Sequence, residues 1–133
     1  MKGKTRLWLG LLAALIIAVM AYFMIGEATR GPVIGFEPSS LSFAAKQGGQ
    51  NPKSQILSIK NAGVGNMLWA VSSGAQWLSL SPTIGSSSGE IDEVTASVDI
   101  SGMSAGDYSA TITITAEKAP NSPQTVAVDL SIG

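Results

Sequence analysis

The segment DYSATITITA, residues 107–116, decides the fold class of this chain. Its apolar side chains, among them Ile112 and Ile114, alternate with Ser and Thr, which is the period-two pattern of a β-strand with one buried and one solvated face. The segment QTVAVDLSI, residues 124–132, repeats the pattern. Because the apolar faces of such strands need a second layer to cover them, the two segments predict a β-sandwich.

Five further segments carry strand patterns, and turn-forming residues separate them. Stretches such as KQGGQNPK (46–53) are rich in Gly, Pro and Asn, which set or permit the backbone angles of turns. After Ile25 no stretch sustains the 3.6-residue period of a helix. The size and spacing predict a seven-stranded immunoglobulin-like (Ig-like) β-sandwich. The strands are expected at 41–45, 54–60, 67–72, 77–80, 90–100, 107–116 and 124–132.

The N-terminal region has a different composition. Of the 19 residues at 7–25, only Gly10 is not apolar. A helix rises about 1.5 Å per residue, so such a run spans about 28 Å and matches the roughly 30 Å hydrocarbon core of a bilayer. We therefore expect an all-β sandwich preceded by one transmembrane α-helix at 7–26.

The charges before this run predict its orientation. Lys2, Lys4 and Arg6 precede it, and the positive-inside rule places such residues in the cytoplasm. The predicted organisation is a cytoplasmic N-terminus at 1–6, the transmembrane helix, a short tether at 27–35 and an extracytoplasmic sandwich at 36–133.

A cleaved signal peptide is the alternative to the anchor. A basic start followed by an apolar run is also the pattern of a secretory signal, and the small residues around Ala21 offer a cleavage site. The apolar core of a signal peptide is about 7–15 residues long, however, and here apolar residues continue to Ile25. The length favours a retained anchor and leaves secretion after cleavage as the other interpretation.

Within the predicted helix, Gly10, Ala14 and Ala18 recur every fourth residue and share one face. Small residues at this spacing let a second transmembrane helix approach closely, so they predict a helix-packing face. The alternative is that small residues are simply common in membrane helices.

The chain contains no His and no Cys, which excludes imidazole and thiolate chemistry and disulfide bonds. Residues 31–133 hold four Lys against eight acidic residues, a charge of −4, which argues against nucleic-acid binding. No catalytic constellation is recognisable. We expect a protein that is not an enzyme and that uses no cofactor or metal.

Six segments of the predicted sandwich follow one another as PSSLSF (38–43), QGG (47–49), NAG (61–63) with LW (68–69), AQWLSLSP (75–82), GDYSATITI (106–114) and NSPQTV (121–126). In this order they resemble the BACON group of bacterial Ig-like domains. The resemblance covers about 35–133 and implies an Ig-like fold. Domains of this group occur in secreted or surface proteins, often beside carbohydrate-active enzymes, so it implies sugar binding or a spacer role and supplies no catalytic residues. It also implies that the anchor lies in a bacterial cytoplasmic (inner) membrane, with the sandwich in the periplasm or outside the cell.

Three aromatic residues are candidates for a site. Sugar rings stack on exposed planar side chains. Trp77 lies close to a Pro-containing turn and is the candidate for surface binding, with core packing as the alternative. Trp69 lies mid-strand, where Ig-like folds bury a Trp, and Tyr108 begins a strand, so we expect Trp69 in the core and Tyr108 in the core or in a corner hydrogen bond.

Acidic residues cluster at Glu90, Asp92 and Glu93, with Asp99 and Asp107 further along the chain. Carboxylate oxygens are ligands for Ca²⁺, but this spacing matches no Ca²⁺-binding loop. We therefore expect a solvated strand edge whose charges oppose edge-to-edge pairing.

These observations favour a non-catalytic single-pass membrane protein whose Ig-like domain makes protein contacts. By analogy with small one-helix subunits, it is expected to be an accessory or structural subunit of a larger membrane complex, for example a respiratory or photosynthetic one. The expected partners are other membrane-protein subunits and the lipid bilayer. The alternative function is a membrane-anchored carbohydrate-binding module with a glycan as ligand.

Overall fold

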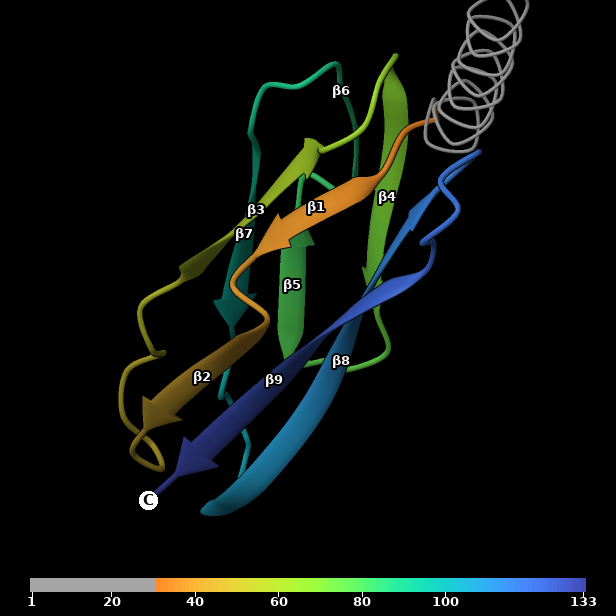
Figure 1. The fold of residues 1–133 in the computed structure, drawn as a ribbon. Coiled ribbons are helices and arrows are strands. Elements are labelled where there is room, and N and C mark those ends of the chain that lie inside the picture. The colour runs from red at the N-terminus through yellow and green to blue at the C-terminus, as the bar shows by residue number, and fades with distance from the viewer. Residues whose placement is uncertain (1–30) are drawn as a thin grey trace, which may run out of the picture. The chain divides into compact units, whose positions relative to one another are not determined.

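The computed structural model describes residues 31–133, and in this part of the chain nine β-strands and no helix are found (Figure 1). The predicted transmembrane helix, with its face of Gly10, Ala14 and Ala18, lies outside the described residues. Within residues 31–133 there is no helix that could cross a bilayer. The strands are β1 (Ile34–Glu37), β2 (Ser40–Ala45), β3 (Gln55–Asn61), β4 (Met67–Ser73), β5 (Leu78–Ser81), β6 (Ile84–Ser87), β7 (Asp92–Val98), β8 (Gly106–Ala116) and β9 (Gln124–Ile132).

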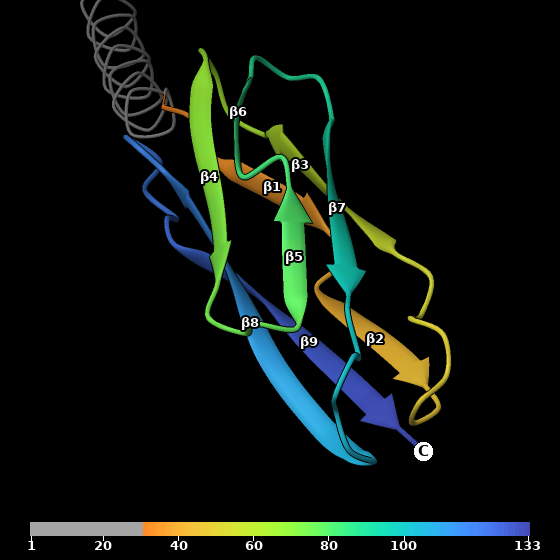
Figure 2. The same ribbon diagram turned by 180° about the vertical axis from the view of Figure 1, so that it is seen from behind.

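The strands form two sheets that pack face to face (Figures 1 and 2). The four-stranded sheet has the order β1-β3-β7-β5 and the five-stranded sheet the order β2-β9-β8-β4-β6. All pairs are antiparallel except β2 with β9, which is parallel. Between β1 and β2 the chain crosses from one sheet to the other at Pro38. The predicted all-β, Ig-like sandwich is thereby confirmed.

The alternating side chains of the central strands form the core. In the five-stranded sheet Ile112 of β8 pairs with Val126 of β9, and both are fully buried. From the four-stranded sheet, Leu57 of β3 and Val94 of β7 are a directly opposed pair and are also fully buried. The Ser and Thr residues between the core positions of β8 and β9 lie on the outer face, which is mostly solvated.

The predicted number of seven strands is wrong, because the structure has nine. The two missed strands, β1 and β6, have four residues each, and each contains a glycine and adjoins a proline-containing turn. Their pairing with β3 and β4 makes them strands, and a single sequence does not display such pairing. Ile34 and Gly35, assigned to the tether, therefore belong to β1.

A buried asparagine holds the chain where it enters the domain. Asn61, 4% exposed, is one of only two buried polar residues in the described part of the chain, and Ser87 is the other. Its Oδ1 accepts hydrogen bonds from the backbone N–H groups of Val33 (3.1 Å) and Gly63 (2.9 Å). Its Nδ2 donates to the carbonyl of Gly65 (2.8 Å), so one side chain fixes both the entering segment and the β3–β4 loop.

Ser87 connects this asparagine to the next loop. The backbone N–H of Asn61 donates to Oγ of Ser87 (3.0 Å), and that hydroxyl donates to the carbonyl of Glu90 (2.7 Å). The backbone N–H of Gly89 also donates to Ser87 Oγ (3.2 Å). The β6–β7 loop is therefore tied to the end of β3 by a fully buried hydroxyl.

Side-chain amides also bond to one residue on each of two edge strands. At the edge strand β1, Asn121 accepts a hydrogen bond from the N–H of Ile34 and donates one to its carbonyl, both at 3.0 Å. At the edge strand β2, Nε2 of Gln55 donates to the carbonyl of Ser42 (2.6 Å). Backbone groups at strand edges are templates for pairing with another chain, and these amides occupy some of them.

We predict that Asn61→Ala lowers the free energy of unfolding by about 2–4 kcal/mol, because several hydrogen bonds, each worth about 0.5–1.5 kcal/mol, are lost together. Urea unfolding of the full chain in a mild detergent measures the change. Asn66→Ala is the matched control, since Asn66 is exposed and makes no side-chain hydrogen bond within residues 31–133. Equal stability of the two variants would contradict the assigned role.

Candidate binding surface

Within residues 31–133, two large apolar side chains are exposed on the outer face of β4 and β6. Alternation along β4 turns Met67, Trp69 and Val71 inward and leaves Leu68 outward, 58% exposed. In the neighbouring edge strand, Ile84 is 72% exposed. Side chains of this size on a solvated sheet face mark a surface that favours contact with a partner.

These residues line an open groove of about 840 Å³, here called the β4–β6 groove. The residue opposite Ile84 on β4 is Ala70, and its small side chain leaves space at the bottom of the groove. Glu117 is the one charged side chain in the lining. The lining combines apolar side chains with hydroxyl groups and consists of Leu68, Trp69, Ala70, Ile84, Gly85, Ser86, Thr115, Ala116, Glu117 and Ser122.

Trp69 forms the inner support of the groove. It is 3% exposed, and its indole N–H donates to Oδ2 of Asp92 on β7 (2.8 Å), so the ring connects the two sheets. Its six-membered ring lies against Gly85, where a Cβ atom would be only 2.3 Å from Cζ2 of the indole. The predicted core position of Trp69 is confirmed, and Gly85 is glycine because the ring leaves no room for a side chain.

The groove was not predicted, because Ile84 lies between the strands expected at 77–80 and 90–100. The alternation along β4 does predict one side of the groove, because an inward Trp69 places the neighbouring Leu68 on the outer face. The pairing of Ile84 with Ala70 depends on β6, and the short stretch TIGSS shows no strand periodicity of its own.

Trp77, the predicted surface-binding residue, is half-buried and packs against the core, just before β5. Its carbonyl accepts a hydrogen bond from the N–H of Asp99 (2.9 Å). Among the described aromatic residues, Phe43 is buried and Phe36 is half-buried like Trp77. Residues 31–133 therefore present no fully exposed aromatic ring.

Tyr108 adopts the predicted corner arrangement. Its side chain is half-buried against the core, and its hydroxyl donates to the carbonyl of Ser104, four residues earlier (2.8 Å). A tyrosine that bonds back to the chain just before its strand is a feature of Ig-like sandwiches. Its role is therefore structural.

The carboxylates of Glu90 and Asp99 accept hydrogen bonds within their own loops. Oε2 of Glu90 accepts bonds from the N–H (3.0 Å) and hydroxyl (3.1 Å) of Ser88, and Oδ1 of Asp99 accepts bonds from the hydroxyl (2.6 Å) and N–H (3.0 Å) of Ser101. A backbone hydrogen bond of Glu90 itself, followed by the bonds from Ser88, lowers the pKa of Glu90. The hydroxyl and then the N–H of Ser101 lower the pKa of Asp99.

The expected strand edge at these acidic residues is wrong. Glu93 lies on β7, which pairs with β3 on one side and β5 on the other, so it projects from the outer face of an interior strand. Asp92 is engaged by Trp69, and Asp107 is exposed at the start of β8. Within residues 31–133 no three acidic residues gather closely enough to hold a metal ion.

The two-sheet topology, the buried tryptophan of β4 and the tyrosine corner define an Ig-like β-sandwich domain. A match to a family model identifies the family within this class. The model of the viral BACON domain matches residues 33–130, and the chain belongs to this family. The resemblance of the six sequence segments to a BACON domain is thereby confirmed, and the matching model is that of the viral domain instead of the bacterial group.

Solved structures share the fold. A Bacteroides ovatus GH5 xyloglucanase in complex with a XXXG heptasaccharide is 24% identical, with a TM-score of 0.57 over 75% of this chain and 19% of its own. A putative carbohydrate binding protein from Bacteroides ovatus is 14% identical, with a TM-score of 0.60 over 75% of this chain and 37% of its own. A PapD-like domain of human CEP192 is 19% identical, with a TM-score of 0.54 over 78% of this chain and 84% of its own.

The chain therefore spans less than two thirds of either Bacteroides protein, and similarity at these identities concerns the fold alone. No curated protein matches the chain.

We predict that Gly85→Ala lowers the free energy of unfolding by about 1–3 kcal/mol, the usual cost of overpacking, because the new methyl group displaces the indole of Trp69. Denaturant unfolding measures the loss, and a change in tryptophan fluorescence reports the displaced ring. Gly74→Ala is the control, since a Cβ at Gly74 meets no atom within 4 Å. An unchanged stability of Gly85→Ala would show that the strand relaxes around the methyl group.

Proposed function

We propose that this chain is a non-catalytic binding protein whose Ig-like domain docks a partner protein in the β4–β6 groove. The observation that carries the proposal is the pair of strongly exposed side chains, Leu68 and Ile84, beside the hollow above Ala70. An apolar knob of a partner would fill this hollow and remove both side chains from water, which is the arrangement at the centre of protein interfaces.

The chemistry of the groove specifies the partner further. Glu117 is its one charged residue, and residues 31–133 carry a charge of −4. A partner surface with an aliphatic or aromatic side chain and a basic residue facing Glu117 would complement it. The hydroxyl groups of Ser86 and Thr115 offer hydrogen bonds at the rim.

The proposal includes the membrane anchor. Residues 7–26 would span the cytoplasmic membrane with residues 1–6 in the cytoplasm, and the sandwich would lie on the outer side. The sequence supports this through the length of the apolar run and the basic residues that precede it. A protein built in this way would act as an accessory subunit of a larger membrane complex, with Gly10, Ala14 and Ala18 against a neighbouring helix.

We predict that Leu68→Asp and Ile84→Asp each abolish co-purification of the partner from mild detergent extracts, because a charge placed in an apolar interface must be desolvated. Ile56→Asp is the matched control, since Ile56 is 43% exposed on the other sheet and lies outside the groove. Stable association of both groove variants with the partner would contradict the proposal, as would a wild-type chain that migrates alone.

A carbohydrate-binding module is the second candidate. The fold likeness to the two Bacteroides ovatus proteins, whose names refer to a xyloglucanase and to carbohydrate binding, favours it. The half-buried state of Trp77 and the lack of a fully exposed aromatic ring at 31–133 weigh against it, because sugar rings stack on exposed rings.

If the domain binds glycans through Trp77, then Trp77→Ala should abolish binding to xyloglucan oligosaccharides in a titration with the full chain. The fold of the variant is checked by circular dichroism, and Trp77→Phe, which retains an aromatic face, should keep part of the affinity. Absence of binding by the wild-type chain at millimolar sugar would remove this candidate.

A further inference from the structure

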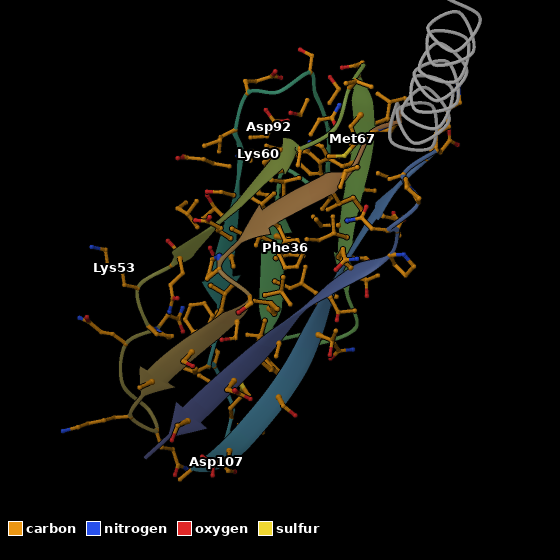
Figure 3. The ribbon with its side chains drawn as sticks, in the orientation of Figure 1. Phe36, Lys53, Lys60, Met67, Asp92 and Asp107 are labelled. Atoms are coloured by element: carbon orange, nitrogen blue, oxygen red, sulfur yellow. The ribbon has the colours of Figure 1, made fainter. Side chains whose placement is uncertain are left out.

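One end of the sandwich carries the point where the chain enters the domain, and apolar side chains are exposed there. At this end lie Gly31, the β3–β4 loop (residues 62–66) and the β6–β7 loop. Val64, in the first of these loops, is 51% exposed, and Ile91, in the second, is 61% exposed. Figure 3 shows Lys60 and Asp92 toward this end of the strands and Asp107 at the opposite end.

Hydrogen bonds fix Val64 beside the entry point. Its N–H donates to the carbonyl of Gly31 (3.2 Å), and the N–H of Ala62 donates to the carbonyl of Val33 (2.8 Å). Nδ2 of Asn61 lies 3.4 Å from the carbonyl of Val64 and 2.8 Å from that of Gly65. These bonds hold the backbone on both sides of Val64, whose side chain is exposed.

The number of residues before Gly31 limits how far this loop can be from a membrane. Only five residues, 26–30, separate the end of the apolar run at Ile25 from Gly31. An extended chain covers at most about 3.3–3.6 Å per residue, so a tether of this length spans at most about 20 Å. The polar layer of a bilayer is about 5–8 Å thick on each side, so the loop is within reach of it.

We propose that Val64 contacts the interfacial layer of the bilayer, so that the β3–β4 loop is a lipid-facing surface of the domain. The inference rests on the anchor of the proposed function. An exposed aliphatic side chain on a fixed loop gains by leaving water for the boundary between headgroups and acyl chains. The ligand is the lipid surface itself.

The charges at this end suit an apolar contact more than an electrostatic one. Lys118, whose carbonyl lies beside Gly31, and Lys60 are two of the four lysines at 31–133. Glu90 and Glu117 lie on the adjoining loops and offset them. The contact should therefore depend little on the fraction of anionic lipid.

The chain has no cysteine, so a single spin label can be introduced by Val64→Cys into the full chain. The protein is reconstituted in vesicles of phosphatidylethanolamine and phosphatidylglycerol. We expect the label at 64 to collide more often with lipid-soluble oxygen than with a water-soluble nickel chelate. Ile56→Cys, an exposed aliphatic position on the outer face of β3, and Asp107→Cys, at the opposite end, should show the reverse order.

Sedimentation with the vesicles after a carbonate wash tests the anchor separately. A chain that sediments with the vesicles but carries a water-exposed label at 64 overturns this inference and leaves the anchor standing. A chain that stays in the supernatant overturns both. If Val64→Cys does not fold, Ala62→Cys places the label in the same loop at another exposed position and is judged by the same comparison.

Discussion

The hydrogen bonds of the buried Asn61 side chain hold the entering segment and the β3–β4 loop in place at one end of the sandwich. The apolar core fixes how the two sheets face each other, and these polar bonds fix the chain segments that meet at this end. The side-chain amide of Asn61 bonds to the backbone of both segments, and the backbone N–H of Asn61 donates to Oγ of Ser87 at the end of β6. A buried polar group of this kind stabilises only when all its partners are present, so the end of the domain forms as a unit.

This division between core and loops explains which surfaces remain for binding. Side-chain amides bond to one residue on each of the edge strands β1 and β2, and the carboxylates of Glu90 and Asp99 form hydrogen bonds within their own loops. The outer sheet faces are mostly Ser and Thr. Leu68 and Ile84 stand out against this background, and neither is needed by the core, since Trp69 and its bond to Asp92 complete the packing beneath them. The packing of the core therefore does not require either side chain, and both are free to contact a partner.

Much of the fold was predictable from the sequence, because alternation along 107–116 and 124–132 depends only on local periodicity. The core position of Trp69 and the corner bond of Tyr108 followed from their places in such strands. The strands β1 and β6 were not predictable, since four residues that include a glycine become a strand only through a distant partner. The groove depends on β6 and was missed with it. The sequence likewise does not display the bonds of Asn61, which connect positions up to 28 residues apart.

The parallel pairing of β2 with β9 has a mechanical consequence. Six residue pairs, from Ser40 with Ala127 to Ala45 with Ile132, join the second strand of the sandwich to its last strand. A force that pulls the start of β2 away from residue 133 acts along these two strands in opposite directions. It therefore loads their hydrogen bonds in shear, all at once, instead of opening them one after another. Tension between the start of β2 and the end of β9 is resisted by all of these bonds together.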